Sequence, residues 1–400
     1  MMSKKSPQLR FKGFTDDWED RNLKDILREF STKSKIENEY RVLSSTNVGM
    51  EFRDGRVSGT SNLGYKIIKN GDLVLSPQNL WLGNININDI GTGLVSPSYK
   101  TFNFTDIDSS FIKPQLRTPK MLEEYKNSST QGASVVRRNL EIDSFYQIKI
   151  ATPSIKEQEK IGSFFAQLDN TIALHQRKLD LLKEQKKGYL QKMFPKNGEK
   201  VPELRFAGFA DDWELRKLKD VTERVRSNDG RMDLPTLTMS ASSGWLDQKD
   251  RFSGDISGKE KKNYTLLKKG ELSYNHGNSK LAKYGVVFSL TNYEEALVPR
   301  VYHSFKALEN TSADFIEYMF STKLPDRELG KLVSSGARMD GLLNINYDDF
   351  MNIYISIPNY EEQILMSAFF RKLDETIALH QRKLDLLKEQ KKGFLQKMFV

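Results

Sequence analysis

The 400-residue sequence contains no cysteine and only 4 histidines. Without cysteine, the chain can form no disulfide, bind no zinc through thiolates and use no cysteine nucleophile. The histidines, His175, His276, His303 and His380, show neither the His-x-His nor the Glu-x-x-His spacing that is common in metal sites. The sequence therefore predicts no metal site.

Long apolar segments are also absent. No apolar run approaches the roughly 20 residues that a membrane-spanning helix requires. The first residues, Met1–Pro7, lead into no apolar segment of the kind that signal peptides contain. The lack of cysteine is in keeping with a reducing compartment. We therefore expect a cytoplasmic protein that does not enter a membrane.

The sequence further lacks the motifs that would mark it as an enzyme. It has no Gly-x-x-x-x-Gly-Lys-Ser/Thr loop, and Gly91-Thr92-Gly93 lacks the third glycine of a dinucleotide site. No Asn/Asp-Pro-Pro-Tyr segment, which amino-methyltransferases use, is present. We expect no catalytic residue and no cofactor in this chain. A nuclease is the enzymatic alternative that these absences disfavour.

What the sequence does have is a surplus of positive charge. The 62 Lys and Arg residues outnumber the 53 Asp and Glu residues, which gives a formal net charge of +9. Such a surplus indicates a polyanionic partner such as a nucleic acid, although scattered lysines on an ordinary soluble protein would give the same value. Hydrophobic residues make up 38% of the chain, enough for buried cores. Its length suits two or more domains.

The strongest signal is an internal duplication. The segment Pro7–Glu19 returns as Pro202–Glu214, with Leu-Arg-Phe-x-Gly-Phe-x-Asp-Asp-Trp-Glu in both copies. Residues 168–195 return as residues 373–400 with only 3 differences, which are Asn170/Glu375, Tyr189/Phe394 and Pro195/Val400. The regions between these repeats differ in length and in almost their entire sequence. Two variable regions therefore lie in one duplicated framework.

The second repeated block predicts a long helix in each half. Apolar residues recur every three or four positions, and no proline interrupts Ile155–Phe194 or Glu361–Phe399. A lone amphipathic helix of this length would expose its apolar seam, so the near-identical twin is the obvious partner. A pseudo-twofold relation between the halves makes the pair antiparallel. The expected seam residues of this coiled coil are Phe165, Leu168, Ile172, His175, Leu179, Leu182, Phe370, Leu373, Ile377, His380, Leu384 and Leu387.

Two features of the expected coiled coil have more than one interpretation. His175 and His380 occupy equivalent seam positions, where a polar residue that sets the register is favoured over a two-histidine metal site. The basic clusters Lys183–Lys187 and Lys388–Lys392 are interpreted first as a solvated helix face and second as a contact with phosphates.

The variable regions, residues 28–150 and 223–358, predict mixed α/β domains. Short β-rich runs such as Asp72–Leu75, Gly285–Phe288 and Tyr146–Ile150 alternate with Gly, Asn, Ser and Pro, and Pro119–Lys126 and Ala313–Thr322 predict short helices. We therefore expect an α+β chain, with two mixed α/β domains separated by two long helices that pair as an antiparallel coiled coil in a pseudo-twofold repeat. The expected order is a stub near the second helix at 1–27, the first domain at 28–150, the first helix at 151–200, the repeated stub at 201–222, the second domain at 223–358 and the second helix at 359–400.

Two loops in each domain have the composition that reading DNA bases requires. One follows a Gly-Asp or Gly-Glu strand, and the other follows a repeated Ser/Gly landmark. Asn, Gln and Arg can form paired hydrogen bonds with adenine or guanine edges, although the same residues are common in plain turns. The candidates are Gln78, Asn79, Trp81, Arg137 and Arg138 in the first domain and Asn275, His276, Asn278, Lys280 and Arg338 in the second.

With these motifs the chain resembles the specificity subunits of type I restriction–modification systems. The resemblance covers essentially the whole chain and rests on the repeated stubs through Trp18 and Trp213 and on the Pro-x-x-x-Glu-Gln entries Pro153–Gln158 and Pro358–Gln363. It implies a non-catalytic subunit whose two target-recognition domains each read one half of a bipartite, asymmetric site on double-stranded DNA.

The resemblance also implies partners. Two copies of an adenine methyltransferase would dock on the helices and stubs, and a restriction/translocase subunit would cleave unmodified DNA. S-adenosylmethionine, ATP and Mg would be bound by those partners and not by this chain. Two alternatives stay open: a partner that fuses methylase and nuclease, and a coiled-coil adaptor whose variable domains bind proteins. Salt-sensitive binding to duplex DNA would favour the DNA-reading function over the adaptor.

Overall fold

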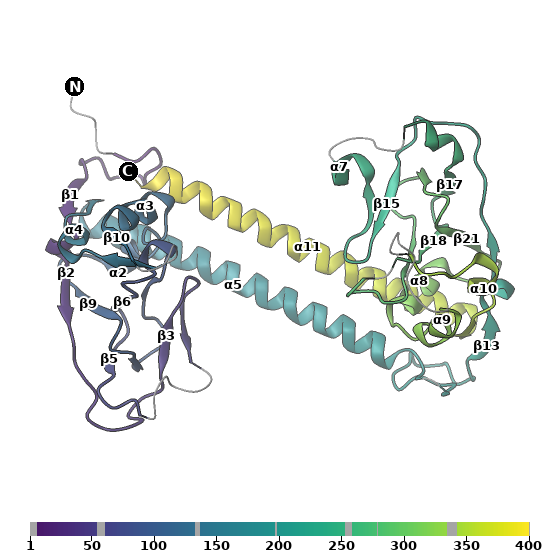
Figure 1. Ribbon diagram of the computed structural model, residues 1–400, viewed down its shortest axis with the longest axis horizontal. Helices are drawn as coiled ribbons and strands as arrows, with labels where there is room; N and C mark the ends of the chain where they lie inside the picture. The colour runs from purple at the N-terminus through teal and green to yellow at the C-terminus, as the bar shows by residue number, and fades with distance from the viewer. Residues whose placement is uncertain are drawn as a thin grey trace. The chain divides into compact units, whose positions relative to one another are not determined.

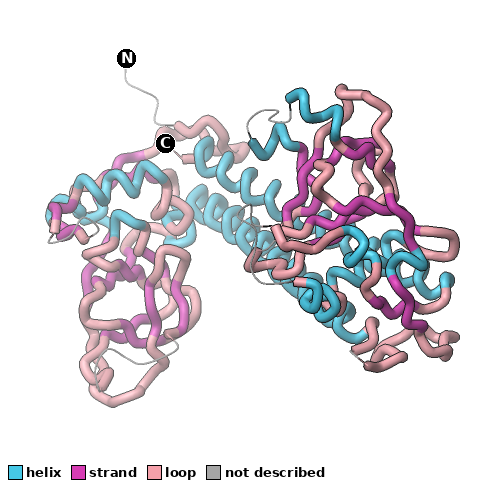
Figure 2. The backbone as a smooth tube through the Cα atoms, turned by 45° about the vertical axis from the view of Figure 1, so that its right-hand side comes forward, coloured by secondary structure: helices cyan, strands magenta, loops and turns pink. Residues whose placement is uncertain are grey.

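The computed structural model describes residues 6–53, 61–132, 137–196, 198–252, 258–277, 279–333 and 342–399. The chain divides into two compact units, residues 1–177 with 381–400, and residues 178–380. Each unit therefore combines one variable region with a part of each long helix. Figure 2 shows strands and helices mixed in both variable regions.

The first variable region and its flanks contain twelve short strands and five short helices among the described residues. Its central four-stranded sheet has the order β2-β9-β6-β7. The elements are β1 (Glu19–Asn22), α1 (Leu23–Ile26), β2 (Leu27–Phe30), β3 (Leu43–Ser45), β4 (Met50–Phe52), β5 (Lys66–Ile68), β6 (Leu73–Leu75), η1 (Leu80–Leu82), β7 (Ile85–Ile87), β8 (Gly93–Val95), β9 (Lys100–Phe104), α2 (Ser109–Ile112), α3 (Pro119–Asn127), β10 (Ser129–Gln131), β11 (Arg138–Leu140), α4 (Ile142–Tyr146) and β12 (Lys149–Thr152).

The second variable region repeats this topology. Its central sheet has the order β14-β21-β18-β19, which corresponds strand for strand to the first. The elements are β13 (Glu214–Lys217), α6 (Leu218–Val221), β14 (Thr222–Arg224), β15 (Leu237–Ser240), β16 (Gly244–Asp247), α7 (Gln248–Phe252), η2 (Gly258–Asn263), β17 (Thr265–Lys268), β18 (Leu272–Asn275), β19 (Val286–Ser289), β20 (Glu295–Val298), β21 (His303–Ala307), α8 (Ala313–Ser321), α9 (Asp326–Leu332), α10 (Tyr347–Met351) and β22 (Tyr354–Ile357).

The register of the two sheets gives residue-by-residue equivalences. In the first, Phe102 of β9 is paired with both Glu29 and Leu73, and in the second, Phe305 of β21 is paired with both Arg224 and Leu272. Phe102 and Phe305 are both fully buried. Position 29 of the first domain is therefore equivalent to position 224 of the second.

Local sequence explains where the predicted short helices begin. The Thr118 hydroxyl accepts a hydrogen bond from the Met121 backbone N–H at the start of α3, and Pro119 occupies its first turn. The predicted strand at Tyr146–Ile150 is wrong in its first half, because Tyr146 ends α4 and the strand β12 begins only at Lys149. Phe145, on the last turn of α4, is fully buried, so packing of the helix prevails over local β propensity.

The duplicated stubs attach each variable region to the long helices. Arg10 donates two hydrogen bonds of 2.7 Å to the buried carboxylate of Glu157, and Arg205 binds the buried Glu362 in the same two-pronged manner at 2.8 and 2.7 Å. The Leu9 N–H donates to the Lys397 carbonyl, as the Leu204 N–H does to that of Lys192. Each stub thus contacts the beginning of one long helix and the end of the other.

An aromatic cluster fills the space beneath each stub. Trp18 packs edge-on against Phe111 and Phe399 at 5.7 and 6.4 Å, and Trp213 packs in the same way against Phe315 and Phe194 at 5.7 and 5.9 Å. Both tryptophans are buried. The repeated tryptophan of the sequence motif is therefore a core residue of each unit.

The long helices are α5 (Ile155–Lys192) and α11 (Tyr360–Met398). Within the first unit, Phe164 contacts Phe394 and Asp169 pairs with Lys391. Within the second, Lys186 pairs with Asp374 at 2.6 Å and Tyr189 contacts Phe369. In both units, residues of increasing number along α5 contact residues of decreasing number along α11, so the two helices are antiparallel (Figure 1). The predicted fold class, two mixed α/β domains with paired long helices in an internal repeat, is confirmed.

The burial of the predicted seam residues is duplicated as well. Six of them are buried, which are Phe165, Leu179, Leu182, Phe370, Leu384 and Leu387. The other six are half-buried, which are Leu168, Ile172, His175, Leu373, Ile377 and His380. Among the described residues, no helix combines the length and the apolarity that crossing a bilayer requires.

Candidate nucleic-acid interface

In the first domain the two predicted DNA-reading loops meet. Gln78 lies exposed in the turn after β6, and its backbone carbonyl accepts a hydrogen bond of 3.3 Å from the Arg138 N–H. Arg137, next to it, is exposed. Chain segments about sixty residues apart in the sequence therefore form one surface, although nothing in the sequence pattern brings them together.

The remaining first-domain candidates are less accessible. Asn79 is half-buried, and its N–H donates to the Ser76 carbonyl within the turn. Trp81 is half-buried against the core of the domain. The Arg138 guanidinium donates hydrogen bonds of 2.8 Å to the hydroxyl and to the carbonyl of Ser129, so it holds β10 beside β11. A role of these three side chains at DNA stays a prediction.

In the second domain the corresponding loop lies beside residues 342–343. The His276 carbonyl accepts a hydrogen bond of 2.8 Å from the Leu343 N–H, and Gly277 forms a bridge with Leu342. Asn275 is half-buried and accepts a hydrogen bond from the Gly277 N–H, whereas Lys280 is exposed. The candidates Asn278 and Arg338 lie outside the described residues.

His276 itself is buried, with 5% of its surface exposed. Its Nδ1 lies 2.8 Å from the Leu343 carbonyl, and its ring stacks on that of His303 with centroids 5.0 Å apart. His303 Nε2 lies 2.9 Å from the Ile345 carbonyl. The two imidazoles thus attach residues 343–345 to β18 and β21, which is a structural task.

Burial lowers the pKa of His303 to about 4, and the nearby charges of His276 and Arg226 act in the same direction. The hydrogen bond to Ile345 opposes this effect without cancelling it. His303 is therefore neutral at pH 7, and its Nε2–H donates to Ile345.

Beside these histidines lies a cavity of about 310 Å³. Three exposed arginines, Arg224, Arg226 and Arg300, stand among the residues that line it, and no carboxylate is among those described lining residues. The Arg224 guanidinium lies over the Tyr347 ring at 3.9 Å. We call the three arginines the arginine cradle.

Sequence reasoning missed the arginine cradle. The candidates from sequence are Asn, Gln and Arg in loops after strands, whereas Arg224 is the last residue of β14, Arg226 lies two residues beyond it and Arg300 precedes β21. The alternating Arg-Val-Arg, with Val225 buried, was the available signal. It indicates two arginines on the same exposed face of a strand.

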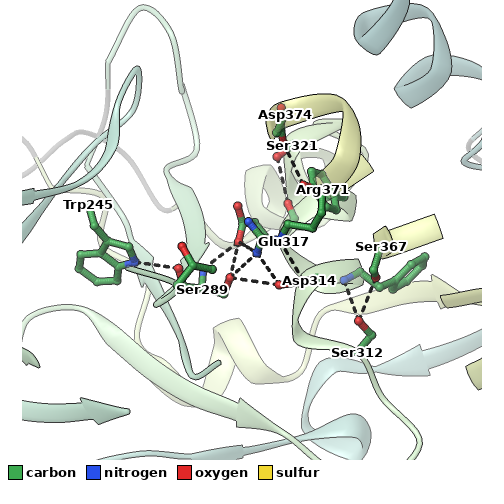
Figure 3. A network of polar contacts seen from close by, with 12 residues as sticks. Trp245, Ser289, Ser312, Asp314, Glu317, Ser321, Ser367, Arg371 and Asp374 are labelled. Carbon is green, nitrogen blue, oxygen red and sulfur yellow. Dashed lines mark hydrogen bonds and ion pairs between the residues drawn. The ribbon is translucent and has the colours of Figure 1, made fainter. Parts of the chain in front are cut away.

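A polar network ties the second domain to α11 (Figure 3). Arg371 of α11 donates to Asp314 at 2.9 Å, to Glu317 at 3.2 Å and to the Ser289 hydroxyl at 2.9 Å. The Trp245 indole N–H donates to the Ser289 carbonyl at 3.1 Å. Arg371 thus connects α11 with α8, β19 and, through Ser289, the β15–β16 hairpin.

No cluster of three or more His, Asp or Glu side chains that could hold a metal ion occurs in the part of the chain that the structure describes. The seam residues His175 and His380 are half-buried in α5 and α11.

A known protein family matches both halves of the chain. The family model described as "Type I restriction modification DNA specificity domain" matches residues 15–184 and 210–389, which include most of both repeats. The chain belongs to this family. The family inferred from the sequence motifs is thereby confirmed, and with it the reading of DNA sequence as the general task of the chain.

Two relatives illustrate the extent of the likeness. The chain is 23% identical over 409 aligned positions to the type I restriction enzyme MjaVIII specificity subunit of Methanocaldococcus jannaschii, with 95% of this chain and 91% of the relative covered. The crystal structure of the type I restriction-modification system S subunit from M. genitalium superposes with a TM-score of 0.61 at 12% identity, over 99% of both chains. At that identity the second likeness shows the fold alone.

Proposed function

We propose that this chain is the non-catalytic DNA-reading subunit of a type I restriction–modification complex, and that each variable domain recognises one half of a bipartite, asymmetric site. The observation that carries the proposal is that the two variable domains share one fold but differ in the side chains on their surfaces. Both domains have the same sheet order, yet equivalent positions carry different side chains, such as Glu29 and Arg224. We assign residues 28–150 to one half-site and residues 223–358 to the other.

The surface of the long helices supports docking of two partner subunits. Leu174 and Leu379 occupy equivalent positions and are 68% and 62% exposed, and Leu181 and Leu386 are each 52% exposed. Because exposed apolar side chains often mark contact surfaces, the equivalent leucines of α5 and α11 indicate two equivalent contact surfaces. We assign them to two copies of a partner adenine methyltransferase. That partner would bind S-adenosylmethionine, and a restriction/translocase subunit would use ATP and Mg.

The test is to map adenine methylation in cells that express the partner methyltransferase with or without this chain. We expect a two-part motif with an undefined spacer, methylated only when both proteins are present. A matched variant replaces residues 28–150 with the corresponding region of a relative and should change one half of the motif alone. Methylation that does not depend on this chain, or a swap that changes both halves or neither, would contradict the proposal. Methylation that does not depend on this chain would favour the protein-binding adaptor.

A further inference from the structure

We infer that the arginine cradle of the second domain binds a phosphate group of the DNA backbone. The inference rests on the proposed function and names a contact within it. Arg224, Arg226 and Arg300 all line one cavity, and none of them forms an ion pair with a residue that the structure describes. Arg231 of the same domain, by contrast, pairs with Asp229 and Glu295.

The surroundings of the cradle favour an anion. The negative charges of Glu223 and Asp348 act on Tyr347, which lines the cavity. Glu223 is already paired with Lys306 at 2.9 Å, so its charge is compensated. His303 is neutral at pH 7 and adds no charge of its own. The Arg224 guanidinium is held over the Tyr347 ring, so it loses little side-chain freedom when it binds.

The first domain supplies an internal comparison, because the repeated register identifies the equivalent positions. Glu29 stands at the position of Arg224 and pairs with Lys100 at 2.8 Å. The Thr32 and Ser227 carbonyls accept equivalent hydrogen bonds from Ile67 and Leu266, so Ser31 stands at the position of Arg226. The same scaffold therefore lacks the cradle in the first domain, which shows that the fold does not require it.

Proline replaces the third arginine in the first domain. The Tyr99 N–H donates to the Ser96 carbonyl and the Tyr302 N–H donates to the Pro299 carbonyl in equivalent turns, so Pro97 stands at the position of Arg300. None of the three arginines of the cradle thus has an arginine at the equivalent position of the first domain. A contact with phosphate carries no information about base sequence. We therefore expect the cradle to add affinity at the second half-site without changing the motif that is read.

The experiment measures binding of the complex of the full chain and its methyltransferase to DNA that contains its methylated motif, at several salt concentrations. In the triple variant Arg224→Gln/Arg226→Gln/Arg300→Gln we expect affinity to fall by about 10- to 100-fold. The dependence of log K on log salt should become less steep by about 1, because one phosphate contact is lost. Methylation mapping should return the unchanged motif.

Two further variants make the result specific. Arg216→Gln removes the same charge from an exposed arginine that pairs with Glu214, and it should leave the salt dependence unchanged. The variant Arg224→Lys/Arg226→Lys/Arg300→Lys keeps the charges and should retain most of the affinity. Circular dichroism establishes that each variant is folded, as expected for exposed positions.

Each other outcome overturns the inference in a distinguishable way. A folded triple variant with the wild-type salt dependence would show that no phosphate is bound there. A change in the second half of the motif would assign the cradle to bases. Binding of inorganic phosphate to the wild type but not to the triple variant, with the affinity for DNA equal in both, would assign the cradle to a free phosphate ligand. If the wild-type complex bound no specific DNA, the proposed function itself would fail.

Discussion

At the scale of single residues, the buried glutamates Glu157 and Glu362 show what the duplicated motifs do. Each is essentially inaccessible to solvent, and each is compensated by a two-pronged arginine from the stub. The next residue is equally constrained, since the Gln158 side chain accepts from the Asp108 N–H and donates to the Pro153 carbonyl, as Gln363 does with Ser312 and Pro358. The Pro-x-x-x-Glu-Gln motif therefore joins stub, domain and helix.

His303 gives a residue-scale prediction about pH. Its pKa is about 4 in the folded protein and 6.5 in the unfolded chain, so between these values the unfolded state binds the extra proton. The second unit should therefore lose stability as the pH falls from about 7 to about 4, by at most about 3 kcal/mol from this group. In His303→Asn, the stability of this unit should depend less on pH, as measured by hydrogen exchange of β21.

A control separates this effect from general acid unfolding. His175→Asn changes a histidine of α5 in the other unit and should leave the pH dependence of β21 as it is in the wild type. If His303→Asn and the wild type lost protection in parallel over this pH range, His303 would not be the responsible group.

The candidate DNA residues show how far sequence alone could go at this scale. Composition predicts Gln78 and Arg137 as DNA-reading residues, and both lie exposed on one surface. Composition predicts His276 as well, but this residue is buried, because its imidazole binds a carbonyl of a segment 67 residues away. Composition identifies side chains able to read DNA, whereas long-range contacts decide which of them remain accessible.

At the scale of elements, the two variable domains attach to their helices by different contacts. In the first domain, Gly162 of α5 lets α2 approach so closely that a Cβ at this position would clash with the Ser110 hydroxyl. In the second, Arg371 of α11 reaches Asp314 and Glu317 of α8. The helix repeat places Ala166 at the position of Arg371. The duplicated helices were predictable from sequence, but these domain-specific contacts were not, because they join the constant and the variable parts.

Arg371 accordingly gives an element-scale prediction. Arg371→Ala leaves Asp314 and the largely buried Glu317 without their cation, which should destabilise the attachment of α8 by about 2 kcal/mol. Hydrogen exchange in Ala313–Ser321 should accelerate, while exchange in the first unit stays unchanged.

The first domain supplies the compensating variant. Arg371→Ala/Asp314→Ser/Glu317→Gln removes the three charges together, with Ala and Ser as at the equivalent positions 166 and 110, and it leaves no buried charge without a partner. It should recover most of the lost protection. Equal losses in the single and triple variants would show that the charge network does not fix α8.

At the scale of the whole molecule, the core of each unit includes the C-terminal end of the long helix that belongs to the other half of the sequence. Phe399 packs on Trp18, and Phe194 packs on Trp213. The two helix ends are nearly identical in sequence, so either could occupy either place. The structure therefore explains why a chain with two different domains retains two nearly equal helices.

A chain that ends after Phe194 tests this interchangeability. It keeps one stub, one domain and one helix, whose end can fill the place of Leu395–Phe399 in a second copy. We expect it to dimerise and, with the methyltransferase, to direct methylation to a symmetric motif made of two inverted copies of one half-site. Light scattering and methylation mapping measure the two effects. A stable monomer that still supported methylation would refute the argument.

The last prediction concerns the long helices as the element that sets the spacer between the half-sites. Inserting one heptad after Leu182 and one after Leu387 keeps the apolar seam in phase, and the pairs Asp169–Lys391 and Lys186–Asp374 can re-form within their units. Seven residues add about 10.5 Å of helix, or roughly three base pairs. Three base pairs also rotate the DNA grooves by about 100°, and a heptad of supercoil supplies little of that rotation.

We therefore expect the insertion variant either to methylate a motif with a longer spacer and weakened affinity, or to lose specific binding while it remains folded. Methylation mapping distinguishes these outcomes, and circular dichroism establishes the folding. Insertion of the heptad after Leu182 alone is the matched control, because it offsets the two seams and should destabilise the helix pair. Full activity of the double insertion on the original motif and spacer would show that something other than helix length sets the separation, since a longer helix pair would then leave the reading of both half-sites unchanged.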